Sequence, residues 1–242
     1  MRTVKLTVSL LTISVCSAML AIPAASATPT KKPSPSETLG KAVAAGEKMR
    51  SVHFVSFDHL GKITISQNGN IGPGKGDIYS VYKDGKASGL SQELFTNGKL
   101  FLKANSSTLI SFFGFKKAGA NKYGNKWVYI PKTDVVYANL TPSLTLAGQM
   151  QQIKIPGKVT YLKNPKINGK KVIGILGTPA SQGGIKEKEV LYISPSDKYL
   201  PIKATLDQSK TAYAWVSFSK WNEIVKISVP SRYSPIGKTG LE

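Results

Sequence analysis

Short strand-like runs separated by pairs of turn residues constrain the fold of this chain more than any other feature. The pairs are Asn-Gly, Asp-Gly or Gly-Gly, and they occur at positions 68–69, 84–85, 97–98, 168–169 and 183–184. Both residues of such a pair tolerate a positive φ, which a tight hairpin requires. The pattern predicts sequential hairpins and therefore a meandering antiparallel sheet.

Between the turns, apolar and polar residues alternate or β-branched residues gather, as is typical of strands. About ten strands are expected, in an α+β protein built on a single sheet. The runs are Val52–Phe57, Lys62–Ser66, Asp77–Lys83, Gln92–Thr96, Lys99–Ala104, Lys126–Ile130, Lys158–Leu162, Lys170–Leu176, Lys188–Ile193, Pro201–Leu206, Ala212–Ser219 and Ile224–Val229. The last run is expected to pair within the main sheet, with Val225, Ile227 and Val229 facing the core.

A helix is predicted before the first strand. Ser34 can cap it, Pro35 suits its first position, and Glu37 completes a capping box. Its apolar face is narrow, so we expect this helix to lie on the sheet.

Two apolar connectors interrupt the strands, at Asn105–Phe115 and Thr141–Ile153, and both are predicted to form short helices. Ordinary packing onto the sheet is one interpretation of their composition. The other is that they close a cavity, because ligand pockets have mostly apolar walls. The expected cavity residues are Leu109, Phe112, Phe113, Leu144, Leu146, Met150 and Ile153.

The amino terminus has the pattern of an export signal. Arg2 and Lys5 precede an apolar stretch, and Ala25-Ser26-Ala27 forms a cleavage motif. Cleavage after Ala27 would give a secreted or otherwise extracytoplasmic protein. The alternative is a lipid anchor at Cys16, which is disfavoured because Val15, the residue before it, is not small.

The charge balance is strongly positive, with 33 Lys and Arg against 13 Asp and Glu and a formal charge of +20. The lysines are spread along the chain with no nucleic-acid motif among them, so no nucleic-acid partner is expected. A solvated lysine-rich surface is one interpretation. The other is attraction to anionic envelope polymers or lipid head groups. The single Cys excludes a disulfide scaffold and a zinc site built on cysteines.

The sequence offers little catalytic chemistry. The two histidines, His53 and His59, lie in one strand-like run, about 20 Å apart at the usual rise, too far to share a metal ion. The S-x-x-K match at residues 217–220 falls in a strand, where Ser217 and Lys220 would point to opposite faces. No catalytic residue, metal or cofactor is therefore predicted.

The order of several short motifs resembles the LppX/LprG-type envelope lipid-carrier lipoproteins and, more remotely, the LolA-like carriers. The motifs are Ala45–Phe54, Asn97–Lys103, Lys126–Pro131, Asn168–Val172, Leu191–Ile193, Leu200–Ala204 and Trp221–Pro230. The resemblance implies a half-open antiparallel β-barrel, with a few short helices on its concave side around an apolar cavity for lipid acyl chains. It implies no enzyme activity. The chain departs from the family in lacking a clear lipobox.

The predicted organisation is a signal peptide (1–27), a flexible tether (28–36), a lipid-binding-like half-barrel (37–230) and a tail (231–242). The expected function is a monomeric, non-enzymatic carrier of a lipid or other apolar small molecule. A basic adhesion module on anionic wall polymers and an uncharacterised hydrolase are the alternatives.

Overall fold

The computed structural model describes residues 32–177, 187–196 and 198–236. The chain divides into two units, Met1–Lys32 and Pro33–Glu242. The described helices and strands all belong to the second unit. The predicted signal peptide lies outside the described residues, and so does the Gly183-Gly184 turn.

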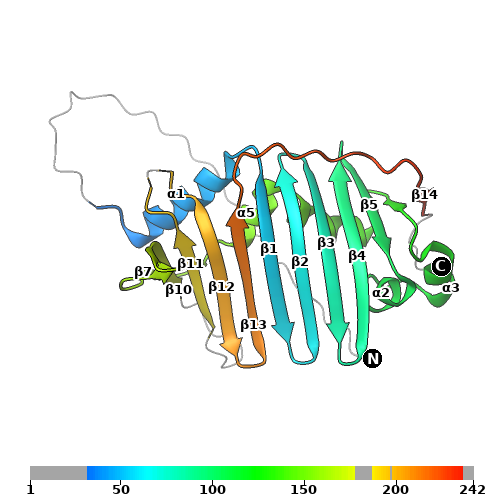
Figure 1. Ribbon diagram of the computed structural model, residues 1–242, viewed down its shortest axis with the longest axis horizontal. Helices are drawn as coiled ribbons and strands as arrows, with labels where there is room; N and C mark the ends of the chain where they lie inside the picture. Colours follow the sequence, from blue (N-terminus) through cyan, green and yellow to red (C-terminus); the bar gives the residue numbers. More distant parts are fainter. Residues whose placement is uncertain (1–31, 178–186, 197, 237–242) are drawn as a thin grey trace. The chain divides into compact units, whose positions relative to one another are not determined.

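The fold is built on one large curved sheet that does not close (Figure 1). It confirms the α+β class, with twelve strands rather than about ten. Their order is β14-β6-β5-β4-β3-β2-β1-β13-β12-β11-β10-β7. Neighbours are antiparallel except β14, which runs parallel to β6. The strands are β1 (Val52–Leu60), β2 (Ile63–Gly72), β3 (Lys75–Asp84), β4 (Ala87–Thr96), β5 (Lys99–Ala104), β6 (Val128–Ile130), β7 (Val159–Tyr161), β10 (Ile173–Gly177), β11 (Lys188–Ile193), β12 (Pro201–Ser209), β13 (Ala212–Ser219) and β14 (Ser234–Pro235), with a separate hairpin of β8 (Lys166–Ile167) and β9 (Lys170–Lys171).

Most of the predicted turn pairs connect strands. Asn97-Gly98 and Asn168-Gly169 have positive φ at both residues, as their hairpins require. The prediction of a turn at Asn68-Gly69 is wrong, because both residues lie inside β2. Gly69 pairs with Phe54, and a side chain at Gly69 would overlap the Phe54 ring. This glycine therefore makes room for a core aromatic.

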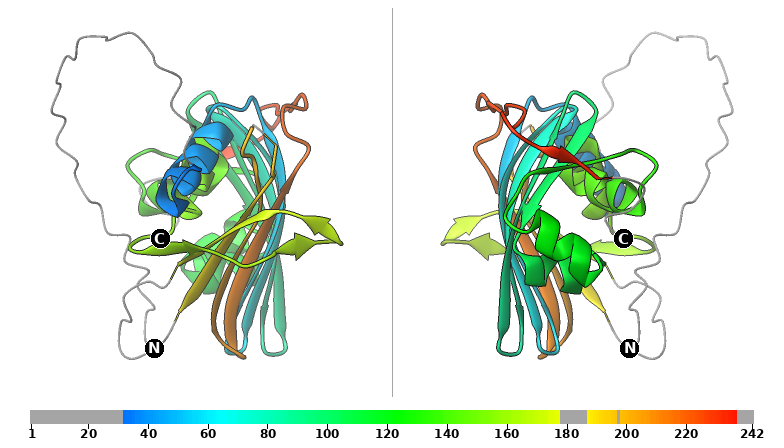
Figure 2. Two further views of the ribbon diagram at one scale, coloured as in Figure 1. Left: turned by 90° about the vertical axis from the view of Figure 1, so that its left-hand side faces the viewer. Right: turned by 90° about the vertical axis from the view of Figure 1, so that its right-hand side faces the viewer.

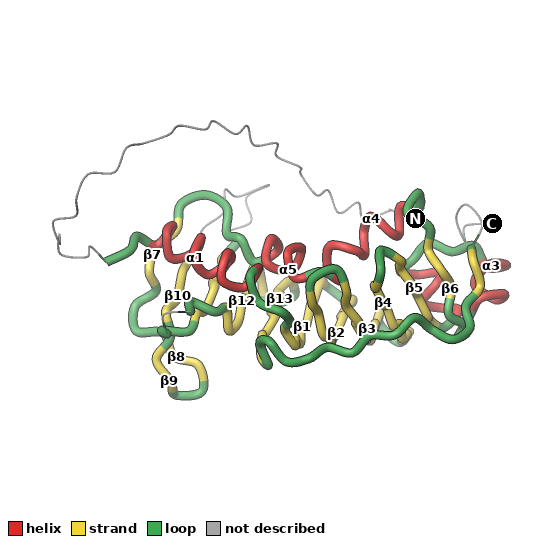
Figure 3. The backbone as a smooth tube through the Cα atoms, turned by 90° about the horizontal axis from the view of Figure 1, so that it is seen from above, coloured by secondary structure: helices red, strands yellow, loops and turns green. Residues whose placement is uncertain are grey.

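The helices lie along one face of the sheet, as the side and top views show (Figures 2 and 3). They are α1 (Pro35–Glu47), α2 (Ser106–Ser111), α3 (Lys117–Tyr123), α4 (Val135–Leu140), the 3-10 helix η1 (Thr141–Leu144) and α5 (Leu146–Gln152). The predicted capping box of α1 is present. The Glu37 amide donates to Ser34 Oγ over 3.2 Å, and the Ser34 amide donates to Glu37 Oε2 over 2.6 Å.

The core forms between the helices and the concave face of the sheet. One cross-strand row on this face runs through Phe54, Gly69, Ile78, Glu93 and Leu102. Apolar side chains of this row are buried against the connectors, which contribute Leu109, Leu144, Leu146 and Met150. The row also contains a buried carboxyl group, Glu93.

The predicted last strand, Ile224–Val229, is wrong. This segment has no strand partner and crosses the ends of the strands from β13 towards β14 (Figure 1). Ile224 is 88% exposed and Val229 is 39% exposed. Lys75 Nζ donates a hydrogen bond to the Val225 carbonyl over 2.9 Å and holds the segment there. Val225 and Ile227, which were expected on the core side, are only partly buried, so the alternation of this segment does not produce a fully buried face.

Among the residues that the structure describes, no helix combines the length and the apolar character needed to cross a membrane.

Candidate ligand cavity

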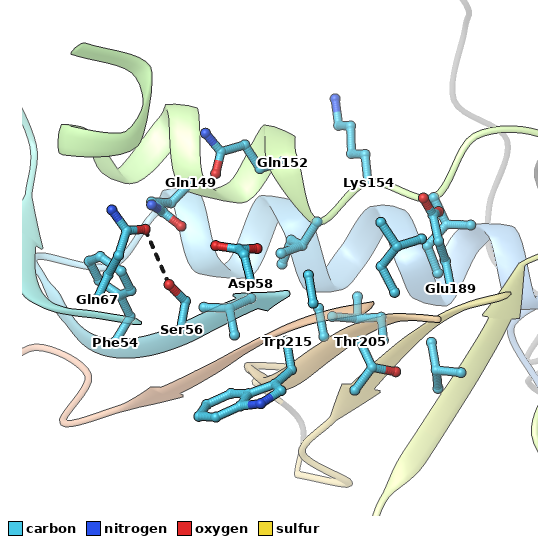
Figure 4. A pocket seen from close by; sticks show the side chains of 18 residues that line it. Phe54, Ser56, Asp58, Gln67, Gln149, Gln152, Lys154, Glu189, Thr205 and Trp215 are labelled. Atoms are coloured by element: carbon cyan, nitrogen blue, oxygen red, sulfur yellow. Dashed lines mark hydrogen bonds between the residues drawn. The ribbon is translucent and has the colours of Figure 1, made fainter. Parts of the chain in front are cut away.

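A cavity of about 220 Å³ lies on the concave side, between α5 with the segment after it and strands β1, β11, β12 and β13 (Figure 4). Apolar and polar groups both contribute to its wall. The lining residues are Phe54, Ser56, Asp58, Gln67, Gln149, Gln152, Ile153, Lys154, Ile155, Glu189, Val190, Leu191, Ala204, Thr205, Leu206, Ala214, Trp215 and Val216.

The floor of the cavity is apolar because alternate residues of β11, β12 and β13 share one face. Val216, Ala204 and Leu191 lie side by side across these strands. Ala214 and Leu206 form the neighbouring row. The alanines leave space above the sheet that larger residues would fill. The Trp215 side chain points away from the cavity, on the other face (Figure 4).

The roof comes from α5 and the residues that follow it. Gln149 is almost fully buried, and its Nε2 donates to the Ser143 carbonyl over 3.0 Å. Ile153 and Ile155 are buried apolar groups of the same wall. Gln152 and Lys154 are exposed, so the cavity reaches the protein surface beside them.

Two carboxyl groups face this cavity, Asp58 on β1 and Glu189 on β11. The strand register places them in one cross-strand row, with Ala214 and Leu206 between them. Burial raises the pKa of Asp58. Burial, followed by the nearby charge of Glu187, raises the pKa of Glu189. Glu189 Oε2 is buried and has no hydrogen-bond partner within the described structure.

A chain of hydrogen bonds leads from the cavity wall across the concave face. Ser56 Oγ donates to Gln67 Oε1 over 3.2 Å (Figure 4). Gln67 Nε2 then donates to Ser80 Oγ, and Ser80 Oγ donates to Glu93 Oε2, each over 3.2 Å. The cavity is thereby connected to a carboxyl group in the core.

Glu93 is 2% exposed and lies among hydroxyl groups. Ser91 and Tyr82 donate to its Oε1, the latter over 3.3 Å. Burial raises the pKa of Glu93 to about 7, although the hydrogen bonds from Ser91, Ser80 and Tyr82 oppose this shift. Burial and the charge of Glu93 also raise the pKa of Tyr82. A substantial fraction of the folded molecules therefore has an uncharged Glu93 near neutral pH.

The seven residues expected to surround a ligand divide between the cavity wall and the packed core. Ile153 lines the cavity. Leu109, Phe113, Leu144, Leu146 and Met150 are buried in the core, and the Phe112 ring packs on the Tyr82 ring with centroids 4.4 Å apart. Contact between these residues and a ligand stays a prediction.

The strand residues of the floor were not predicted as site residues. Their signal was present, since Ala204, Leu206, Ala214 and Val216 are small or aliphatic residues at period two. Glu189 lies on the apolar face of its run, where a carboxyl group is unusual. Small or aliphatic residues at period two, together with a carboxyl group on the same face, are the sequence signal that could have indicated this wall.

The two histidines have ordinary hydrogen-bond partners. His53 Nδ1 lies 3.0 Å from Asn70 Oδ1, and His59 Nε2 lies 2.9 Å from the Gly61 carbonyl oxygen. Across the described part of the chain, no three His, Cys, Asp or Glu side chains are grouped so that they could hold a metal ion.

Comparison with solved structures finds the same fold in a mycobacterial protein. LprF from Mycobacterium bovis is 16% identical, with 81% of this chain and 96% of that chain covered and a TM-score of 0.52. The Mycobacterium tuberculosis lipoprotein LppX is 14% identical, with 80% and 98% covered and a TM-score of 0.49. A putative outer membrane lipoprotein-sorting protein domain from Vibrio parahaemolyticus is 10% identical, with 78% and 92% covered and a TM-score of 0.29.

The likeness to LprF confirms, at the level of the fold, the resemblance predicted from the sequence motifs. No protein-family model matches the sequence, and no curated protein matches it.

Proposed function

We propose that this protein is an exported, non-enzymatic carrier that holds a lipid acyl chain or a similar apolar ligand in the cavity beneath α5. The observation that carries the proposal is the apolar floor of small and aliphatic residues on a concave sheet that helices cover. The shared fold with LprF supports it.

Burial of hydrocarbon supplies the binding free energy. Each buried methylene contributes about 0.8 kcal/mol, so a chain on this floor gains affinity without any catalytic group. The 220 Å³ volume is below the about 300–1,000 Å³ of pockets that enclose drug-sized ligands. The cavity therefore takes one segment of a chain, and a longer ligand continues past Gln152 and Lys154 towards solvent.

Native mass spectrometry of the protein from its own host tests whether it retains a lipid. A fluorescent apolar probe such as N-phenyl-1-naphthylamine then tests the site. Ala204→Trp places an indole on the cavity floor and should abolish probe binding. Ser217→Trp, on β13 but on the opposite face, is the matched control. Absence of both a retained lipid and probe uptake would contradict the carrier function.

The second candidate is an adhesion module on anionic wall polymers, which the formal charge of +20 favours. Binding of wall polymer that disappears with added salt, in a protein that takes up no apolar probe, would support this function instead.

A further inference from the structure

We propose that the cavity selects an amphiphile whose polar group donates hydrogen bonds, most strongly a cationic amine, and that Asp58 and Glu189 receive this group. The inference rests on the proposed carrier function and specifies its ligand class.

One acceptor atom in the described cavity wall, Glu189 Oε2, lacks a hydrogen-bond donor. An ionised carboxyl group only accepts hydrogen bonds, and its two oxygens have several acceptor sites. Glu189 Oε2 is buried with no donor within reach in the described structure. A buried polar atom without a partner costs free energy that a bound donor would recover. The ligand group complementary to this atom is therefore an N–H or O–H, and a positive charge strengthens the hydrogen bond.

Among the described residues, the wall supplies no cation to the two carboxyl groups. Lys154 is the one cationic side chain among the described residues that line the cavity. Its ammonium group points away from Asp58 and Glu189 (Figure 4). Burial raises the pKa of both carboxyl groups, which is the expected shift when desolvation is not offset by a nearby positive charge.

The spacing of the two groups fits a chain that lies along the floor. Asp58 and Glu189 are three strand spacings apart, about 14 Å between backbones. Ala214 and Leu206 lie between them and offer only apolar surface. A ligand can therefore place its polar group at one carboxyl group and its hydrocarbon across the apolar surface of Ala214 and Leu206. A carboxylate or phosphate head group would instead face like charge, which costs free energy.

Displacement of N-phenyl-1-naphthylamine from the full chain tests this selectivity. Dodecylamine, dodecanol and dodecanoate share one chain length and differ in the polar group. At neutral pH we expect dodecylamine to bind at least about tenfold more tightly than dodecanoate, with dodecanol between them. Tenfold corresponds to about 1.4 kcal/mol.

Two variants locate the effect. Asp58→Asn and Glu189→Gln retain shape and remove charge, and at least one should lower the preference for the amine severalfold. Asp207→Asn is the matched control, because Asp207 is exposed on β12 next to Leu206. Neutralising a desolvated carboxyl group should not unfold the protein, and a thermal melt checks this.

The outcomes distinguish a failure of the proposed amine selectivity from a failure of the proposed carrier function. Equal affinity for the three compounds, or an amine preference that survives both variants, overturns the selectivity and leaves the carrier function in place. Failure of all three compounds and of the probe to bind overturns the carrier function itself.

Discussion

The Tyr82 hydroxyl donates a hydrogen bond to Oε1 of Glu93 over 3.3 Å on the concave face of the sheet, where both side chains are buried. Ser80 and Ser91 donate to the same carboxyl group. Within the described structure the chain places three hydroxyl groups, and no cation, around this carboxyl group. Its protonation state is therefore linked to folding.

We predict that the protein becomes less stable as pH rises towards neutrality. The folded pKa of Glu93 is raised to about 7 from 4.5, so between these values the folded protein holds a proton that the unfolded chain releases. The free energy of unfolding then falls with increasing pH, by up to about 3 kcal/mol over this interval. Urea denaturation at several pH values from about 5 to 8 measures it.

The pKa values of Asp58 and Glu189 are also raised, so these two groups would change the stability with pH in the same direction. Glu93→Gln isolates the contribution of Glu93. Glutamine fills similar space and does not titrate. The variant should show a flatter pH profile than the wild type. Identical profiles would show that Glu93 is ionised in the folded protein throughout this range.

A second prediction concerns the contact between α1 and α5. A side chain at Gly46 would overlap the sulfur of Met150, which is fully buried. Met150→Trp adds bulk with no space to receive it and should destabilise the protein by about 1–3 kcal/mol. Ala204→Trp, which extends into the cavity, should leave the free energy of unfolding nearly unchanged. Equal losses for the two would show that the cavity is filled by the surrounding residues.

The first helix and most hairpins were predictable because their signals are local. Ser34 and Glu37 are three residues apart and cap the helix themselves. The Asn97-Gly98 pair adopts the positive φ values of its turn without help from distant residues.

The prediction of a strand at Ile224–Val229 is wrong for a non-local reason. Alternation shows which residues would share a face, but not whether a strand edge is free. Both edges of β13 are already occupied, one by β1 and the other by β12. The segment that follows β13 therefore finds no free strand edge beside it.

The cavity was only partly predictable for the same reason. The apolar connectors signalled that something covers the sheet, and Ile153 does line the cavity. The row that joins Asp58 to Glu189 depends on pairing across four strands and on residues 131 positions apart in sequence. Periodicity within a single run shows which residues share a face, but it does not show which distant strands become neighbours.

A third prediction concerns export. Cleavage after Ala27 should leave Thr28 as the amino terminus, because Ala25-Ser26-Ala27 is the small-residue motif that signal peptidase requires. The intact mass of protein secreted by its own host measures this. A diacylglyceryl adduct on Cys16 would instead indicate a membrane-anchored protein.

The last prediction concerns the segment that crosses the strand ends. The Arg50 amide donates to Asn222 Oδ1 over 2.8 Å, and the Asn222 amide donates to the Ser51 carbonyl over 3.0 Å. Asn222 also has a φ of 67°, which Ala adopts less readily than Asn. Asn222→Ala should therefore cost about 1–2 kcal/mol of stability, and Asn222→Gly less, because Gly loses the side-chain acceptor but tolerates the backbone angle. Ile224→Ala should change nothing measurable, since this side chain is 88% exposed. Chemical denaturation of the three variants tests the order. A large loss for Ile224→Ala would mean that this side chain is buried in the folded protein.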